Sequence, residues 1–216
     1  MNENKQSKFR WGIWLSIFSI IVAVAVIALI VIKQQPDVVY NNVNSPRPVT
    51  GNPAAKVTLV EFSDFECPAC GQVFPIVENL VTRYGKDFRF EFKHFPLTNI
   101  HKDAYNAALA SECANDQAKF WDYYKTLYQN QTKLSVADLK KYAVDLKLDT
   151  VKFDACLDTK AKKKVVDEDI KEAKAKNLSG TPTFFLNGQQ VNMQSYADLE
   201  TALKAAITGV QQGPVK

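Results

Sequence analysis

The chain has 216 residues, a formal net charge of +4 and 46% hydrophobic residues. This length is sufficient for one domain with a sizeable core or for two small domains. The lysines are spread along the chain, and the short lysine-rich run at residues 160–164 is typical of a solvated helix face. The charge therefore does not indicate a nucleic-acid partner.

The first informative segment is the uncharged stretch at residues 11–32, which is long enough to span a bilayer as a helix. Basic residues precede it within residues 1–10, and only Lys33 follows closely, so the positive-inside rule keeps residues 1–10 in the cytoplasm. We expect a single-pass signal-anchor in the cell membrane, with the folded domain on the extracytoplasmic side. A cleaved signal peptide is the alternative, although its apolar stretch normally has only about 7 to 15 residues.

Residues 33–53 are rich in Pro and Asn and show no periodicity, which predicts an extended linker. We expect the folded domain to cover residues 54–210. It begins with the pattern of a strand–helix–strand unit: an apolar run at residues 57–65, apolar residues at helical spacing from Cys67 to about Tyr84, and alternation at residues 88–95.

Residues from about 98 to 177 have helical character throughout, and Ser135 is expected to cap one of these helices. Asn187-Gly188 then predicts a β-hairpin, and a final helix is expected from Ser195. The helical crossover makes the first two strands parallel, whereas the hairpin adds antiparallel strands. The sequence thus predicts an α/β domain, a mixed β-sheet flanked by helices with an all-helical insertion, preceded by a transmembrane helix.

Four cysteines lie in the part of the chain that is expected outside the cytoplasm, where disulfides persist. Cys67 and Cys70 have a spacing more typical of an active site than of a structural bond. This leaves Cys113 to form a structural disulfide with Cys156 between two helices of the insertion. The rival interpretation makes Cys113 and Cys156 buried free cysteines or a relay to the active site.

Cys67 is expected to follow a strand and open a helix. The unpaired N–H groups and the positive dipole end of a helix stabilise a thiolate, so Cys67 should have a lowered pKa and be reactive. Cys70 lies one turn further on the same face and should be less exposed. In this arrangement a substrate thiolate attacks Cys67, while Cys70 leaves and later resolves the mixed disulfide.

A zinc half-site is the alternative for this cysteine pair. A structural zinc ion needs four ligands, but the sequence offers only His94 and His101 and no second Cys-x-x-Cys motif. We therefore expect no metal, and we expect His94 to be a packed or hydrogen-bonded residue at a strand end.

Several features together resemble the exported DsbA-like, BdbD-like branch of the thioredoxin superfamily, over about residues 56–207. Cys67-Pro68-Ala69-Cys70 fits the redox motif, although its central dipeptide lacks the histidine of the best-known oxidases. Glu61 falls at the position where this family has a buried acidic residue beneath the second cysteine. The alternative is that Glu61 is an exposed carboxylate on an edge strand. Pro75 falls at a helix-kinking proline, and Pro182, preceded by Thr181, falls at a cis proline that packs against the disulfide.

The resemblance implies a membrane-anchored protein-disulfide oxidoreductase that forms disulfides in exported, unfolded proteins with free thiols. Its catalytic residues would be Cys67, Cys70 and Glu61, and Thr181 and Pro182 would bind substrate. It implies no cofactor, a monomer, and re-oxidation by a DsbB-like or vitamin-K-epoxide-reductase-like (VKOR-like) membrane partner. Two alternatives stay open, which are an isomerase or reductase of the same fold and a non-catalytic exported binding module.

Overall fold

The structure is a computed structural model, and it describes residues 47–212. The predicted cytoplasmic segment 1–10, the predicted transmembrane segment 11–32 and most of the predicted linker 33–53 lie outside the described residues. Among residues 47–212, no helix combines the length and the apolar character needed to cross a membrane.

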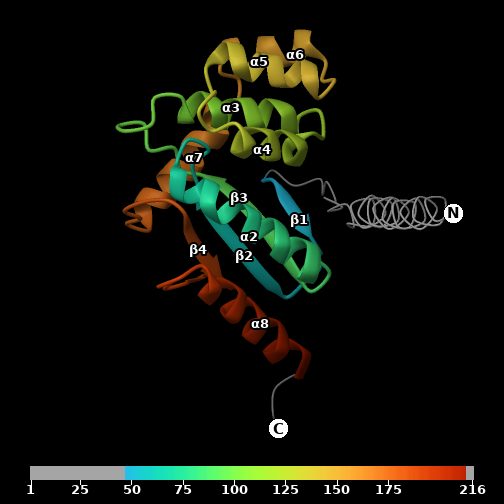
Figure 1. Ribbon diagram of the computed structural model, residues 1–216, viewed down its shortest axis with the longest axis vertical. Helices are drawn as coiled ribbons and strands as arrows, with labels where there is room; N and C mark the ends of the chain where they lie inside the picture. The colour runs from blue at the N-terminus through green and yellow to red at the C-terminus, as the bar shows by residue number, and fades with distance from the viewer. Residues whose placement is uncertain (1–46, 213–216) are drawn as a thin grey trace, which may run out of the picture. The chain divides into compact units, whose positions relative to one another are not determined.

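The described residues form a mixed sheet, as predicted, and it has five strands (Figure 1). Its strands β2 and β3 pair in parallel, because the helix α2 connects them as a crossover. The other neighbours pair antiparallel. In spatial order the strands are β1 (Val49–Gly51), β3 (Phe88–His94), β2 (Val57–Ser63), β4 (Thr183–Leu186) and β5 (Gln189–Gln190).

Helices flank this sheet and form the insertion between β3 and β4. Helix α2 (Pro68–Tyr84) crosses one face of the sheet in Figure 1, and α8 (Ala197–Gln212) contacts β2 and β4. The insertion is helical, as predicted, and Ser135 caps α5 by accepting a hydrogen bond from the Asp138 N–H. Its helices are α3 (Ala104–Asn115), α4 (Phe120–Gln129), α5 (Val136–Asp145), α6 (Thr150–Asp158) and α7 (Lys163–Ala175).

Strand β1 was expected to be part of the linker, and for residues 49–51 that prediction is wrong. Val49 is 2% exposed and pairs with Glu91 of β3. The indole N–H of Trp121 donates to the Val49 carbonyl oxygen at 3.2 Å. The segment is a strand because remote partners from β3 and α4 complete it, and its own sequence carries little strand signal.

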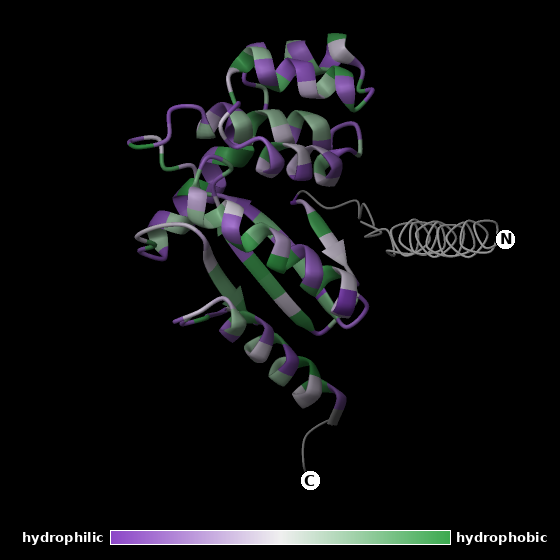
Figure 2. Cartoon of the chain, in the orientation of Figure 1, coloured by the Kyte–Doolittle hydropathy of each residue, from purple (hydrophilic) through white to green (hydrophobic). Residues whose placement is uncertain are grey.

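The core between the sheet and the helices is rich in aromatic residues. Phe65 stacks on Phe92. Tyr124 of α4 packs edge-on against Phe92 and stacks on Phe120. Strand β2 is largely hydrophobic in Figure 2, whereas α5 and α6 carry many hydrophilic residues. The sheet and α2 thus form a hydrophobic core region, whereas the outer helices of the insertion, α5 and α6, are more hydrophilic.

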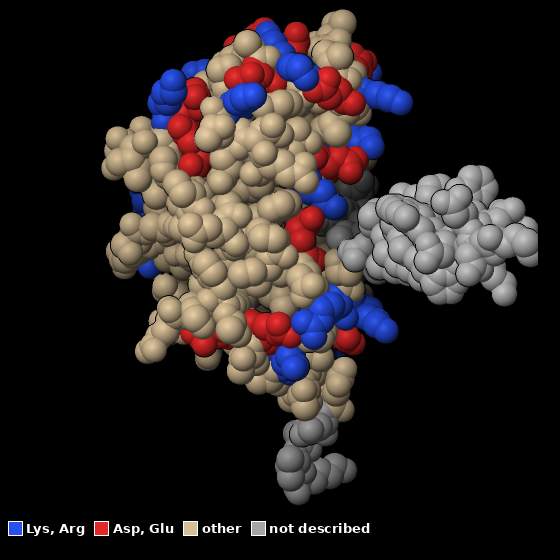
Figure 3. Space-filling model, in the orientation of Figure 1, with Lys and Arg blue, Asp and Glu red and all other residues tan. Residues whose placement is uncertain are grey.

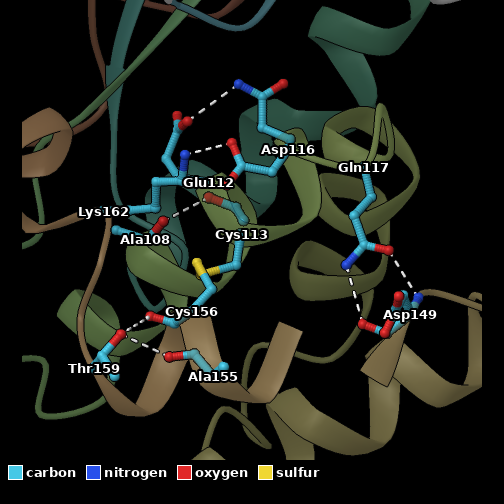
Figure 4. Close-up of a disulfide and its surroundings, with 12 residues drawn as sticks. Ala108, Glu112, Cys113, Asp116, Gln117, Asp149, Ala155, Cys156, Thr159 and Lys162 are labelled. Atoms are coloured by element: carbon cyan, nitrogen blue, oxygen red, sulfur yellow. Dashed lines mark hydrogen bonds and ion pairs between the residues drawn. A yellow bond between two sulfur atoms is a disulfide. The ribbon is translucent and has the colours of Figure 1, made fainter. Parts of the chain in front are cut away.

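Cys113 of α3 and Cys156 of α6 form a disulfide with their Cα atoms 5.9 Å apart (Figure 4). A second link joins the same region, because the Gln117 side chain bonds to both the N–H and the carbonyl oxygen of Asp149, which caps α6. These contacts fasten α6 to α3.

Candidate active site

Cys67 lies between the end of β2 and the first turn of α2, where it is the N-cap residue and Pro68 follows at the first helical position. Its pKa is lowered from 9.0 to about 5. The largest cause is a hydrogen bond from the Cys70 side chain, and Thr181 and the backbone N–H groups of Cys70 and Ala69 add to it. The predicted thiolate-stabilising helix end is therefore present.

Cys70 is completely buried, one turn further along α2. Burial raises the pKa of its thiol strongly, and the hydrogen bond to Cys67 and the nearby Glu61 carboxylate raise it further. Both cysteines are free thiols in the structure. The two sulfur atoms are thus chemically unequal, since the pKa of the Cys67 thiol is lowered and the pKa of the Cys70 thiol is raised.

Cys67 is itself only 6% exposed, although we expected it to present a partly exposed sulfur. The Thr181 carbonyl oxygen lies 3.4 Å from Cys67 Sγ and covers part of it. The reactive sulfur is therefore recessed beside the Thr181 loop.

The Thr181-Pro182 peptide bond is cis. The 3.4 Å contact between Cys67 Sγ and the Thr181 carbonyl oxygen places this loop directly against the cysteine pair. A shallow cavity of about 260 Å³ begins at Pro182 and continues along β4 to Val191 and Met193. Of the two residues predicted to bind substrate, Pro182 lines this cavity and Thr181 contacts Cys67.

Glu61 is 1% exposed on β2, which is an interior strand of the sheet, so the edge-strand alternative is wrong. Burial raises the pKa of its carboxyl group to about 7, against a lowering effect of the hydrogen bond from Ser63. One carboxyl oxygen accepts that bond at 2.7 Å, and the other oxygen is buried without a partner among the described residues. Its charge raises the Cys70 pKa, so the two groups are near neighbours.

Ser63 and Tyr128 complete this buried polar group, and the sequence analysis did not single them out. The Ser63 hydroxyl donates to Glu61 and shares a 2.8 Å hydrogen bond with the Tyr128 hydroxyl. The alternation of β2 could have placed Ser63 on the same face as Glu61, because residues two apart share a face. Tyr128 comes from α4 of the insertion, and no local pattern links it to β2.

The two histidines of the discarded zinc alternative bond elsewhere. His94 Nε2 lies 3.0 Å from a Glu112 carboxylate oxygen in the core, and His101 Nδ1 lies 2.7 Å from Asp64 Oδ2. Asp64 also accepts the backbone N–H groups of Glu66 and Leu97, so it fastens the loop after β3 to the loop that carries Cys67. His94 is a hydrogen-bonded residue at a strand end, as expected.

A family model described as thioredoxin matches residues 43–205, and the chain belongs to this family. The fold is that of the DsbA- and BdbD-type thiol–disulfide oxidoreductases. The oxidised BdbD of Bacillus subtilis superposes with a TM-score of 0.66 at 27% identity, covering 76% of this chain and 94% of that one. A thioredoxin-like oxidoreductase from Silicibacter pomeroyi superposes with a TM-score of 0.68 at 24% identity, covering 81% and 99%.

Similar sequences also occur within larger proteins. The Na(+)/H(+) antiporter NhaA 1 of Salinispora arenicola is 42% identical over 165 residues, which are 76% of this chain and 25% of the antiporter. The antiporter NhaA of Herminiimonas arsenicoxydans is 34% identical over 158 residues, which are 73% of this chain and 25% of that protein. The chain thus spans about a quarter of the length of these curated relatives.

Proposed function

We propose that this chain is an anchored, extracytoplasmic thiol–disulfide oxidoreductase that forms disulfides in exported proteins through Cys67 and Cys70. The observation that carries the proposal is the inequality of the two sulfur atoms. A Cys67 pKa of about 5 favours the reduced form of the pair, and Cys70, whose pKa is raised, stays a neutral thiol that donates a hydrogen bond to Cys67. A pair that is stable when reduced takes electrons readily from its substrates.

The oxidative reaction begins with the Cys67–Cys70 disulfide. A substrate thiolate attacks Cys67 Sγ, the bond between Cys67 and Cys70 breaks, and Cys70 leaves with the electron pair. A second thiolate of the substrate then attacks the substrate sulfur of the mixed disulfide. The substrate leaves with a new disulfide and Cys67 leaves as a thiolate, so two electrons pass from the substrate to the pair.

Glu61 is suited to manage the proton of Cys70. Because its pKa is about 7, its carboxyl group holds a proton in an appreciable fraction of molecules near neutral pH. It gives that proton to Cys70 when Cys70 leaves, and it takes the proton back when the pair is oxidised again. Its unpartnered oxygen is the atom available for this transfer.

The surface beside this site fits an unfolded client. In Figure 3 the face over α2 carries few charged side chains, whereas charges gather over α5 and α6. A weakly charged surface next to the reactive sulfur accepts extended chains of varied sequence, with little dependence on their charge.

The exported setting, the transmembrane anchor at residues 11–32 and re-oxidation by a DsbB- or VKOR-like membrane partner belong to the same proposal. They are supported by the uncharged 11–32 stretch and by the Cys113–Cys156 disulfide, a bond typical of oxidising compartments. The antiporter activity is not part of this proposal, because the chain spans only about a quarter of those relatives.

A trapping experiment tests the central claim. In Cys70→Ser, with Cys67 first converted to a mixed disulfide with glutathione, the thiolate of a reduced, unfolded model protein with a single cysteine should displace glutathione and stay bonded to Cys67, whereas Cys67→Ser treated in the same way should capture none. A functional Cys67→Ser variant would favour the non-catalytic binding module. The reduction potential of the pair separates oxidase from reductase, and a value near that of thioredoxin, about −270 mV, would contradict the oxidase.

A further inference from the structure

Gln131, in the segment between α4 and α5, binds the backbone of the active-site loop. Its side-chain N–H₂ group donates to the Phe65 carbonyl oxygen and to the Cys67 carbonyl oxygen, each at 2.9 Å. The Cys67 carbonyl also accepts the first helical hydrogen bond of α2, from the Gly71 N–H at 3.1 Å. The helical insertion thus reaches the backbone of the reactive cysteine through one amide group.

Gly71 leaves the space that this amide group occupies. A Cβ atom at Gly71 would clash with the Gln131 Oε1 atom and would lie 2.6 Å from its Cδ atom. The residue after Cys70 therefore has no side chain, because the Gln131 amide lies over the first turn of α2. Any larger residue at position 71 would displace the amide from its two carbonyl partners.

We propose that Gln131 is a positioning residue that tunes the Cys67 thiolate, a role that rests on the proposed thiol–disulfide exchange. The Cys67 carbonyl oxygen carries a partial negative charge, and it belongs to the same residue as the thiolate, which it repels. The Gln131 N–H₂ group offsets that charge and fixes the peptide plane. The fixed plane keeps Cys67 Sγ directed toward the N–H groups of Ala69 and Cys70, which stabilise its thiolate.

The consequence for the reaction has a definite sign. A stabilised thiolate favours the reduced pair and makes the protein a stronger oxidant. Loss of the Gln131 amide should raise the Cys67 pKa and make the pair less oxidising. Two neutral hydrogen bonds correspond to about a tenfold change in the equilibrium constant with glutathione, which is about 30 mV for this two-electron couple.

The test compares Gln131→Ala, Gly71→Ala and the double variant in the full chain. The Cys67 pKa is followed through the ultraviolet absorbance of its thiolate, and the equilibrium with glutathione is measured separately. Both single variants should shift both quantities in the same direction, and the double variant should show no further shift, because each removes the same contact. Gln129→Ala, at an exposed position of α4, and Gly209→Ala, where an added methyl group meets no atom within 4 Å, are the matched controls.

An unchanged Cys67 pKa and glutathione equilibrium in Gln131→Ala would overturn the proposal, and so would effects of the two single variants that add. Thermal melting and near-ultraviolet circular dichroism show whether each variant is folded. Gln131→Glu provides a second test should Gln131→Ala unfold, because its carboxylate fills the space but cannot donate, and it should shift the thiolate at least as far. If the wild-type chain itself exchanges no disulfides, the proposed function fails, which is a different outcome from an active wild type that Gln131 does not tune.

Discussion

The Glu61 carboxyl group is held by one oxygen only, since Ser63 donates to it at 2.7 Å and the other oxygen has no described partner. That hydrogen bond lowers the Glu61 pKa against the effect of burial. Ser63→Ala should therefore raise the Glu61 pKa above about 7. Infrared titration of the carboxyl group and the pH profile of mixed-disulfide resolution should both move to higher pH.

Ser111→Ala is the control for this substitution, because Ser111 is also a buried serine but donates to a backbone carbonyl of α3. It should leave the Glu61 titration unchanged. A Glu61 pKa that stays the same or falls in Ser63→Ala would show that the Ser63 hydroxyl does not stabilise the carboxylate.

The raised Glu61 pKa also predicts how stability depends on pH in the dithiol form. Because the folded-state pKa of about 7 lies above the ordinary value of 4.5, the stability that protonated Glu61 provides is fully present below about pH 4.5 and is lost as the pH rises to about 7. Glu61→Gln should thus be more stable than the wild type at about pH 9, by about 3 kcal/mol, and gain little at about pH 4. Urea unfolding at the two pH values measures the difference.

The control for this pH dependence is Glu200→Gln. The hydrogen bond from Tyr84 lowers the pKa of the Glu200 carboxyl group, so this variant should gain no stability at high pH. Equal gains in both variants would mean that a general charge effect, and not the burial of Glu61, governs the result.

At the scale of the elements, the Cys113–Cys156 disulfide closes a loop with a sequence separation of 43 residues. Chain entropy predicts a stabilisation of about 4 kcal/mol for a loop of this length. Replacing both cysteines with alanine should lower the melting temperature while the Cys67–Cys70 exchange continues at low temperature. The wild type with this bond reduced is the matched control and should melt close to the double variant, and an unchanged melting temperature would contradict the stabilising role.

Elements with strong local signals were predictable, and elements that depend on remote partners were not. Asn187 and Gly188 have φ values of 51° and 83°, as the hairpin turn requires. The Asn-Gly dipeptide alone predicts this geometry. Strand β1 depends on pairing with β3 and on a bond from Trp121, and nothing in its own three residues distinguishes it from linker. Gln131 was missed for the same reason, because its partners Phe65 and Cys67 are remote in sequence.

At the scale of the whole molecule, the folded domain includes residues 49–51, which were predicted to be linker. Val49→Asp in the full chain should therefore lower the free energy of unfolding by several kcal/mol, because it buries a charge at a position that is 2% exposed. Val151→Asp, at a position that is 79% exposed on α6, is the matched control and should change stability little. Chemical denaturation measures both free energies of unfolding. An equally small effect at Val49 would mean that residues 49–51 do not contribute to the stability of the folded domain and act as linker.

The two edges of the sheet are its shortest strands, with three residues in β1 and two in β5, while β2 and β3 are paired on both sides. A long unpaired edge recruits extended segments of other chains and seeds aggregation. Unfolded clients, as proposed here, would bring such segments to the protein at every turnover. The short edges leave few free backbone groups for such segments to join, so they would protect the protein from co-aggregating with the proposed clients.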